Sequence, residues 1–465
     1  MLDPIVAQPS LADALAEAAR RWPGPASVAA LADALAAELG PAQVSTVEAA
    51  RRAASTDFAW LSPLLPAALP DQPADVVAYP RTTAELVAAV RLAHRHQVPV
   101  TPRGIGSGNY GQAVPLARGL VVDLSRCDRV LDAGVGWIRA EAGATFVALE
   151  AAARRTGQEV AMLPTTVGST IGGFLAGGAG GVGSIEHGFL WDGFVIALDV
   201  VTCPPHAGPV AVSGSGCGPY LHAYGVTGII ATATVRLVPA RDWVAVLASF
   251  PAAAGDLARL AGLELLRQQP APRLLSVDEP RLVATYPADP AMPADRFSVR
   301  AVVDSSMVAV ARRVVEAHDG RVEQVRPDGS AYLTSLSFNH VTLRARRRRP
   351  ELCHLQVAGE ALVSRSDEVR AVLPETLMHL DGLRTVFDPA DPTRGRHYGG
   401  LLLSAFHDAR TLYTGASQLR ELGVHVVDPH TWLLGGPALP AIRDLAVAND
   451  PDGLLNPGKL PLPSR

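Results

Sequence analysis

The sequence predicts an α+β fold, with a helical N-terminal extension followed by two domains of mixed helices and strands. Three observations lead to this prediction. Residues 1–70 have helical patterns only, residues 71–240 alternate short strands with helices, and residues 241–433 resume that alternation after a break. Segments with an apolar period of two adjoin segments with a period of 3.6, which favours α+β over a strictly doubly wound sheet. Residues 434–465 form a closing C-terminal segment.

The composition is that of a compact globular protein. Of the 465 residues, 48% are hydrophobic and 18% are charged, which is enough core for two or three domains. A net charge of −4 gives no electrostatic reason to expect nucleic acid or a membrane surface as a partner. No long apolar stretch and no signal peptide after Met1–Pro4 are present, so we expect a cytoplasmic protein. Heavy use of Ala, Gly, Pro and Arg suggests a bacterial source, and the basic run Arg344–Arg349 is expected to be a solvated loop or a carboxylate-binding edge.

The N-terminal extension contains one hexapeptide twice. Leu-Ala-Asp-Ala-Leu-Ala occurs at Leu11–Ala16 and again at Leu31–Ala36. Apolar residues at i and i+4 place one apolar face on each segment, which predicts two amphipathic helices. We expect this pair to dock either on the body of the protein or on a second subunit in a homodimer.

Residues 71–240 begin with strand Asp75–Tyr79 and a helix from Thr83 to about His96. Thr82 and Glu85 fit a capping box at the start of that helix. A second helix is predicted at Phe146–Arg155. The other predicted strands are Val98–Thr101, Leu120–Leu124, Trp137–Ala142, Phe194–Thr202 and Ile229–Leu237.

Residues 241–433 show fewer clear elements. The predicted strands are Arg296–Val303, Tyr332–Phe338 and His354–Val357, and the predicted helices are Met307–His318 and Ser366–Leu373. A last helix, Pro440–Asn449, precedes a Pro/Gly-rich tail.

A glycine-rich loop follows the strand that ends at Thr101. Within Pro102–Gly111, four glycines leave backbone N–H groups free to turn inward around an anion such as a diphosphate. An ordinary glycine-rich turn is the alternative. A dinucleotide-binding G-x-G-x-x-G match at Gly106, Gly108 and Gly111 lacks the helix that should follow it, and a second match from Gly178 lacks both strand and helix.

A second loop combines hydroxyl groups and glycines without any charged side chain. It runs from Pro164 to Gly173 and continues through Gly177–Gly183. Such a surface suits a flat ligand held closely by backbone groups. A third motif, Tyr224–Ile230, is a tight turn that leads into a strand.

Together, these motifs resemble the FAD-binding domain of the vanillyl-alcohol oxidase/p-cresol methylhydroxylase (PCMH-type) superfamily. The resemblance covers about Ala74–Pro239, with a further match in the tail at Asp450–Lys459. It implies a two-subdomain FAD-binding domain at residues 71–240 and an α+β cap over the substrate at 241–433. It also implies that residues 434–465 return to the FAD domain and that the protein is an FAD-linked oxidase or dehydrogenase.

The resemblance also assigns residues to the cofactor. The diphosphate loop would comprise Arg103, Gly104, Ile105, Gly106, Ser107, Gly108 and Asn109. The isoalloxazine and ribityl chain would contact Pro164, Thr165, Thr166, Gly168, Thr170, Ile171, Gly172 and Gly173, with Gly178, Gly180 and Ser184 continuing the pocket. Ile229 would lie on the adenine side, and Asn456 and Lys459 would return from the tail. A surface position is the alternative for Lys459, the chain's one lysine.

The FAD is expected to be non-covalent. Relatives that tether FAD carry a histidine in the diphosphate loop or a cysteine before the proline of the second motif. Ser107 and Leu163 occupy those positions here. Attachment through a cap residue is the alternative.

Three cap residues are candidates for catalysis: Asn339, His340 and His430. Each histidine follows a predicted strand and could accept a substrate proton while hydride leaves for the flavin. The polar neighbours Asn339 and Asp428 could fix a tautomer, and a structural role is the alternative for both rings. His397 and Tyr398 are next in line, and His425 and His430 lie on opposite faces of a strand, which does not favour a metal site.

We therefore expect hydride transfer from a small alcohol, phenol, amine or hydroxy acid to FAD, followed by reoxidation by oxygen or another acceptor. The alternatives are a nicotinamide-dependent Rossmann dehydrogenase and a redox-inactive flavin-fold binding protein. Gly106 is expected to tolerate no side chain, because a Cβ would disturb the amide groups of the loop.

Overall fold

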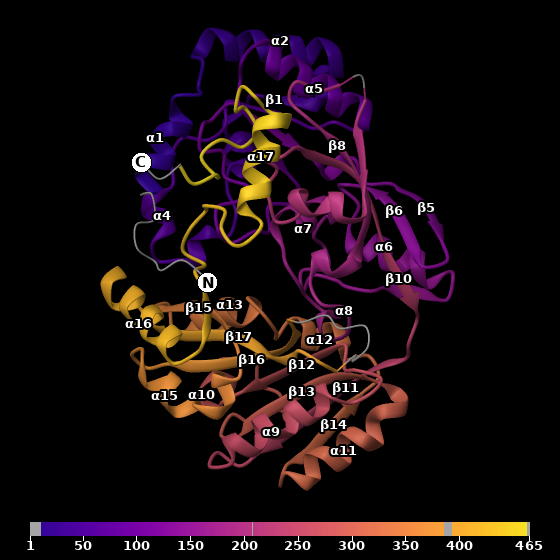
Figure 1. Ribbon diagram of the computed structural model, residues 1–465, viewed down its shortest axis with the longest axis vertical. Coiled ribbons are helices and arrows are strands. Elements are labelled where there is room, and N and C mark those ends of the chain that lie inside the picture. The colour runs from indigo at the N-terminus through magenta and orange to yellow at the C-terminus, as the bar shows by residue number, and fades with distance from the viewer. Residues whose placement is uncertain (1–10, 207, 386–392, 463–465) are drawn as a thin grey trace.

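A computed structural model of the protein describes residues 11–206, 208–385 and 393–462. The Met1–Pro4 segment considered for a signal peptide lies outside these ranges. Figure 1 shows two halves, with the indigo and magenta part of the chain above and the pink and orange part below. The yellow C-terminal segment crosses from the lower half to the upper half. The predicted α+β fold class is confirmed.

The N-terminal extension forms two helices at the predicted places. These are α1 (Leu11–Ala19) and α2 (Pro25–Leu39). Leu31 and Leu35 are fully buried, and α2 packs on α5 (Thr83–Arg95). The helical pair therefore docks on the body of its own chain.

The first sheet has four strands in the order β1-β2-β4-β3, and its last three strands run parallel. Its strands are β1 (Val44–Ser45), β2 (Val76–Ala78), β4 (Leu120–Asp123) and β3 (Val100–Arg103). The Thr82 hydroxyl caps α5 by accepting a hydrogen bond from the Glu85 N–H at 3.2 Å, as predicted. In a full capping box the Glu85 carboxylate would accept from the Thr82 N–H, but here it accepts from the Arg81 N–H at 2.7 Å.

The second sheet is antiparallel and contains six strands. Its order is β5-β6-β10-β8-β9, and β7 also pairs with β10. The strands are β5 (Val130–Gly134), β6 (Trp137–Glu141), β7 (Gln158–Val160), β8 (Val195–Val201), β9 (Val210–Ser213) and β10 (Ile229–Pro239). Helices α6 (Phe146–Arg154) and α7 (Ile171–Gly177) pack on it.

The lower half is built on an eight-stranded antiparallel sheet in the order β14-β11-β13-β12-β16-β17-β15-β18. The strands are β11 (Trp243–Phe250), β12 (Leu274–Asp278), β13 (Phe297–Asp304), β14 (Arg321–Arg326), β15 (Leu352–Ala358), β16 (Leu377–Arg384), β17 (Arg396–Ala405) and β18 (His425–Val427). Helices that include α9 (Gly255–Leu266), α11 (Val308–Ala317) and α16 (Ala409–Glu421) share one core with one face of this sheet.

The other face of this sheet is turned toward the upper half. Leu352, Leu377 and Leu403 belong to the same buried cluster as the core of the first two sheets, whereas Cys353 and Met378 belong to the helix-covered cluster. Because side chains alternate along a strand, His354 and Gln356 share the face of Leu352. Alternate residues of each strand therefore face the upper half, which contains the three motifs assigned to FAD (Pro102–Gly111, Pro164–Gly183 and Tyr224–Ile230); these are called the FAD motifs below.

One predicted strand is wrong. Residues Tyr332–Phe338 form helix α12 (Ser330–Thr334) and a turn, and α13 (His340–Arg348) begins directly afterwards. Leu333 and Leu336 are both buried and lie three residues apart, a helical spacing that the β-favouring side chains nearby had masked. The basic run ends helix α13 and is not a solvated loop. Arg346 donates hydrogen bonds to the carbonyls of Trp60 and Leu61, and Arg349 pairs with Glu351 at 2.8 Å and Glu375 at 2.6 Å, in agreement with the carboxylate-binding alternative.

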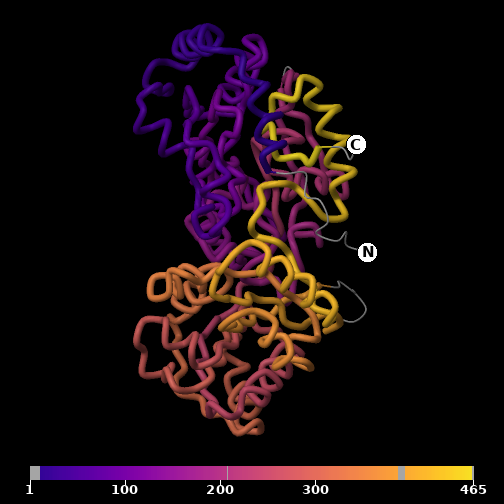
Figure 2. The backbone as a smooth tube through the Cα atoms, turned by 90° about the vertical axis from the view of Figure 1, so that its left-hand side faces the viewer, coloured from indigo at the N-terminus to yellow at the C-terminus, as the bar shows by residue number. Residues whose placement is uncertain are grey.

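The C-terminal segment returns to the first sheet. After α17 (Leu439–Asn449), Leu455 forms a parallel bridge with Val100 of β3. Figure 2 shows the same return, with the yellow tube beside the indigo and magenta parts of the chain. None of the helices within the described ranges is long and apolar enough to cross a membrane.

Candidate functional site

The loop after β3 has the form that a diphosphate site needs. Across the described ranges, no amide N–H of residues 104–109 donates a loop or side-chain hydrogen bond, so these groups are available to an anion. A Cβ on Gly104 would lie 2.1 Å from the Thr170 hydroxyl, and one on Gly106 (φ +69°) would lie 2.0 Å from the Arg103 guanidinium. The two glycines thus pack closely against Thr170 and Arg103, and the free amide groups of the loop fit the diphosphate of FAD.

Arg103 supports this loop from behind. Its guanidinium donates to the carbonyls of Thr56 at 2.7 Å and Ala53 at 3.3 Å. Burial lowers the pKa of Arg103, and the charges of Asp123 and Asp57 oppose that shift. A side chain at Gly106 would therefore clash with the Arg103 guanidinium, and it would not point into the space where the diphosphate is expected.

The first two motifs meet through hydroxyl groups. Ser107 Oγ lies 2.8 Å from Ser169 Oγ, which in turn lies 2.6 Å from Thr166 Oγ1. Thr170 caps α7 by accepting from the Gly173 N–H at 3.3 Å. Among the other predicted residues of this motif, Thr165, Gly168 and Gly173 are at least partly exposed, whereas Pro164, Ile171 and Gly172 are buried beneath them.

The continuation of the second motif is tied to the third. Ser184 Oγ accepts from the Gly181 N–H at 2.8 Å, and the carbonyl of Gly178 lies 2.9 Å from His222 Nδ1. His222 has a φ of +51° and Tyr224 one of +52°, a conformation that side-chain-bearing residues rarely adopt. The sequence interpretation missed His222, although it lies two residues before the third motif.

Of the remaining predicted residues of these motifs, Ile229 is buried at the start of β10 and Gly180 is half-buried. A Cβ on Gly180 would lie 2.8 Å from Ser184 Oγ, so this glycine is also needed for close packing.

Lys459 is fully buried, so the surface interpretation is wrong. Its ammonium donates to the carbonyls of Gly111 at 2.6 Å and Val114 at 2.9 Å, directly after the diphosphate loop. Burial lowers the pKa of Lys459 to about 7, against the attraction of Asp57. Asn456 acts similarly, donating to the carbonyls of Gln112 at 3.1 Å and Tyr224 at 2.7 Å. The tail thus holds the backbone behind the loop.

Tyr110 joins the upper half to the cap. Its hydroxyl accepts hydrogen bonds from Gln356 Nε2 of β15 and from Asn339 Nδ2 at 3.3 Å. Burial raises the pKa of Tyr110 to about 12, so the phenol stays protonated at neutral pH. Sequence reasoning did not single out Tyr110, although it directly follows Asn109 of the loop.

His340 lies against the second motif. Burial and the charge of Arg344 lower the pKa of His340, while the backbone carbonyl of Thr165 opposes them. Its Nε2 has no hydrogen-bond partner among the residues that the structure describes. Asn339 and His340 therefore face different FAD motifs, through Tyr110 and Thr165 respectively.

His430 has a defined tautomer. Ser62 Oγ accepts from the N–H groups of Leu64 at 3.1 Å and Leu65 at 3.2 Å and lies 2.9 Å from His430 Nδ1. A hydroxyl has one donor and two acceptor positions, so the Ser62 O–H donates to Nδ1. The lowered pKa of His430, caused mainly by burial, keeps the ring neutral, and its proton is therefore on Nε2.

His354 of β15 is a second buried imidazole on this face. Its ring centroid lies 6.3 Å from that of His430. Burial lowers the pKa of His354 to about 3, and neither of its ring nitrogens has a partner in the described ranges. A buried polar atom without a partner is costly, which suggests that this region is built to receive polar groups.

The reserve candidates lie elsewhere. The Tyr398 hydroxyl donates to the Arg259 carbonyl at 2.8 Å within the helix-covered core. His397 pairs through Nε2 with Thr385 Oγ1 at 2.6 Å. Asp428 Oδ1 accepts from the His430 N–H at 2.8 Å and so fixes that residue's backbone.

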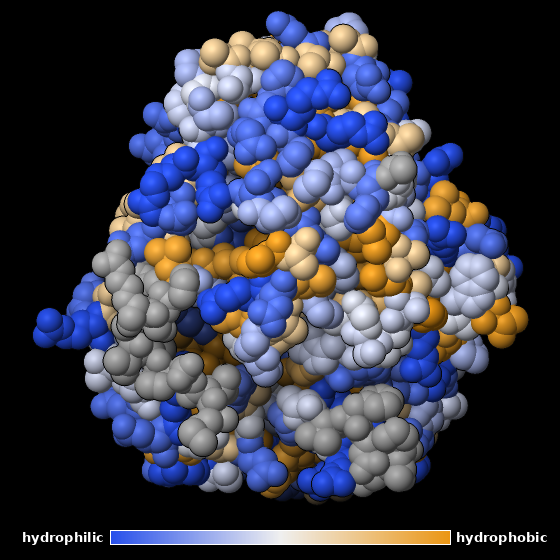
Figure 3. Space-filling view, turned by 45° about the horizontal axis from the view of Figure 1, so that its top comes forward, coloured by the Kyte–Doolittle hydropathy of each residue, from blue (hydrophilic) through white to orange (hydrophobic). Residues whose placement is uncertain are grey.

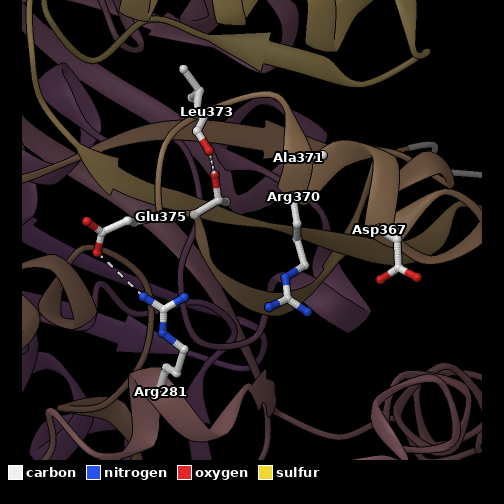
Figure 4. A pocket seen from close by; sticks show the side chains of 7 residues that line it. Arg281, Asp367, Arg370, Ala371, Leu373 and Glu375 are labelled. Atoms are coloured by element: carbon white, nitrogen blue, oxygen red, sulfur yellow. Dashed lines mark hydrogen bonds and ion pairs between the residues drawn. The ribbon is translucent and has the colours of Figure 1, made fainter.

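A separate pocket on the cap does not belong to this site. It is lined by Arg281, Asp367, Arg370, Ala371, Leu373, Glu375 and Thr376, most of them drawn in Figure 4. Both arginines of this pocket already pair, Arg281 with Glu375 at 3.6 Å and Arg370 with Glu279 at 3.1 Å. Figure 3 shows a largely hydrophilic molecular face with scattered hydrophobic patches.

Comparison with known proteins gives a family match within the upper half. Residues 74–204 match the family described as FAD binding domain. The chain is 30% identical over 185 residues to D-lactate dehydrogenase of Archaeoglobus fulgidus, covering 38% of this chain and 42% of that protein. It is 28% identical over 173 residues to glycolate oxidase subunit GlcD of Escherichia coli, covering 35% and 34%. These matches span less than half the length of either relative.

The whole fold has solved counterparts. An alkyldihydroxyacetonephosphate synthase structure superposes with a TM-score of 0.72 over 92% of this chain and 84% of that chain, at 16% identity. This likeness extends the shared fold to the cap.

Proposed function

We propose that the chain is an FAD-linked oxidoreductase of the vanillyl-alcohol oxidase/p-cresol methylhydroxylase type that acts on a small hydroxylated substrate, because residues 74–204 match the family described as FAD binding domain. In this proposal, residues 71–240 hold FAD and residues 241–433 cover the substrate. The observation that carries the proposal is the meeting of the diphosphate loop with polar cap residues at Tyr110, Asn339 and Gln356.

The proposed cofactor contacts begin at the free amide groups of residues 104–109, which would hold the diphosphate. Thr165, Thr166 and Gly168 would line the flavin side, and the tail residues Asn456 and Lys459 would act indirectly by holding the loop. Bound FAD supplies a hydride acceptor at the flavin ring. The FAD is proposed to be non-covalent because Ser107 and Leu163 stand where relatives carry the tethering histidine and cysteine.

The catalytic roles follow from protonation states. We assign the base to His340, because burial lowers its pKa, which favours the neutral ring, and its Nε2 has no hydrogen-bond partner among the described residues. His430 carries its proton on Nε2, so it acts as a hydrogen-bond donor. The Tyr110 phenol, protonated at neutral pH, provides a second donor to the substrate oxygen.

The substrate class to test first is the 2-hydroxy acids, because two relatives are named for D-lactate and glycolate. Purified protein should be yellow, and anaerobic D-lactate, glycolate or a simple alcohol should bleach it. His340→Gln should slow this bleaching by about 10²–10⁴-fold while FAD content stays at the wild-type level. His407→Gln, an exposed histidine of the loop before α16, is the matched control and should bleach normally.

Two other results would redirect the proposal. Colourless protein that binds a nicotinamide cofactor would support the Rossmann alternative. Yellow protein that no candidate reduces would favour a redox-inactive binding protein. Oxygen uptake during turnover, compared with reduction of a quinone or cytochrome, identifies the electron acceptor.

A further inference from the structure

Four charged side chains lie fully buried on the face of the cap sheet that is turned toward the FAD motifs. They are Asp278 of β12, Arg300 of β13, and His379 and Asp381 of β16, each at most 1% exposed. His379 Nδ1 lies 2.6 Å from Asp278 Oδ1, and His379 Nε2 lies 2.7 Å from Asp381 Oδ2. Arg300 Nη2 donates to Asp278 Oδ2.

The geometry sets the charges of this network. Both ring nitrogens of His379 face carboxylate oxygens, so both must donate, and only the imidazolium form has two donors. The two carboxylates raise the pKa of His379 to about 9 in spite of burial. The two cations, His379 and Arg300, therefore balance the two anions, and the network has no net charge.

The network is attached to the segment that carries two proposed catalytic residues. Arg300 Nη2 donates to the Leu336 carbonyl at 2.9 Å, and Asp381 Oδ2 accepts from the Phe338 N–H at 2.9 Å. Phe338 has a φ of +50°, in the left-handed region that a bulky residue avoids. Asn339 and His340 follow immediately, at the start of α13.

Stability alone does not account for such a network. Replacing a buried ion pair by apolar residues often leaves a protein equally stable, and some buried charges instead specify one conformation. Strained backbone persists only where its surroundings enforce it, and it concentrates at functional sites. The two hydrogen bonds to Leu336 and Phe338 are what enforce it here.

We propose that Asp278, Arg300, His379 and Asp381 form a positioning network, which holds the strained Phe338 turn so that Asn339 reaches Tyr110 and His340 reaches Thr165. None of the four is a catalytic residue, because each acts through the backbone of residues 336–338. The assignment rests on the proposed function for the value of that positioning, whereas the holding of the turn is independent of it.

The test uses the FAD-loaded protein and a charge-balanced double variant, His379→Gln with Asp381→Ala, which leaves no side-chain acceptor at position 381 for the Phe338 N–H. Hydrogen exchange is measured on peptides that cover residues 330–345. The Phe338 amide should exchange about 100-fold faster than in the wild type, because the carboxylate that accepts its hydrogen bond is gone. FAD content should not change, and flavin reduction at saturating substrate should slow about 10–100-fold, with the larger effect on kcat than on KM.

Tyr286→Phe is the matched control. Its hydroxyl donates to Asp278 Oδ2 at 2.9 Å, so the variant disturbs the same network but leaves both contacts to residues 336–338 in place. This variant should retain slow exchange at Phe338. Fast exchange in Tyr286→Phe to the extent of the double variant would show general loosening of the cap and would overturn the proposal.

Each of the remaining outcomes also tests one part of the proposal. Slow exchange in the double variant means that the network does not hold the turn. Fast exchange with wild-type flavin reduction means that the held turn positions nothing the reaction needs. If no substrate reduces the wild-type flavin, the proposed function fails, and the exchange result alone decides whether the network holds the turn.

If the double variant does not fold, the wild type provides the measurement. Between pH 7 and 10, His379 loses its proton among Asp278, Asp381, Arg300 and the Tyr286 phenol. Exchange at residues 336–340, corrected for its intrinsic pH dependence, should then accelerate relative to the amides of α5. An unchanged ratio would overturn the proposal.

Discussion

Gly106→Ala should weaken FAD binding through Arg103. The new Cβ would lie 2.0 Å from the guanidinium, which must move and give up its hydrogen bonds to the carbonyls of Thr56 and Ala53. Hydrogen bonds to a charged group contribute about 1.5–3 kcal/mol each when buried, and these two are exposed, so the combined loss is at most about 3 kcal/mol. Only the part of this loss that disturbs the loop conformation needed for FAD lowers affinity, so at about 1.4 kcal/mol per factor of ten FAD affinity should fall by up to about 100-fold.

The backbone conformation also costs free energy, and Gly157→Ala measures that part separately. Gly157 has a φ of +70°, against +69° for Gly106, but a Cβ there would meet no atom within 4 Å. Both variants bear about 1–2 kcal/mol of left-handed strain, and only Gly106→Ala displaces Arg103. The melting temperature of Gly157→Ala measures the strain, and titration of the two apoproteins with FAD, followed by the quenching of FAD fluorescence, measures the effect on affinity. Equal dissociation constants would refute the role given to Arg103.

Three further predictions concern the cofactor, the tail and the cap. Acid denaturation should release all FAD into the supernatant, since Ser107 and Leu163 offer no tether; flavin that precipitates with the chain would reveal a covalent bond. Lys459→Met should lower both the melting temperature and the FAD content, because two buried carbonyls lose their donor at about 1–3 kcal/mol each; unchanged melting would contradict this. His379 has a folded pKa of about 9 against an ordinary value of 6.5, so its stabilisation is complete below about pH 6.5 and is lost as the pH rises through 9. Urea unfolding should show this loss in the wild type but not in His379→Gln, and parallel pH profiles would count against it.

The upper half was largely predictable because its signals are local. Gly104 and Gly106 mark a loop that can take no side chain, and Thr82 marks the start of α5 wherever the rest of the chain lies. Each depends on backbone geometry within a few residues, so the sequence alone contains the information. The predicted strands of this half differ from β3, β4, β6, β8 and β10 only at their ends.

The cap was less predictable because its strands are buried on both faces. β11, β12, β16 and β17 went unpredicted, since a strand covered on both sides lacks the alternation of apolar and polar residues that marks an exposed sheet. The polar residues within them, such as His379 and Asp381, are polar because they pair with one another. Their spacing in the sequence predicts a buried strand only once the pairing residues on neighbouring strands are known.

The sequence by itself therefore determined the fold class, the glycine-rich loops proposed to bind FAD and two of the three histidines of the proposed site. Only the tertiary structure placed Lys459 behind the diphosphate loop, joined Tyr110 to Gln356, fixed the tautomer of His430 and connected Asp381 to the Phe338 turn. The physical reason is the same in each case. A hydrogen bond or ion pair between residues that are far apart in the chain leaves no local pattern, and burial then decides the charge and donor role that each side chain adopts.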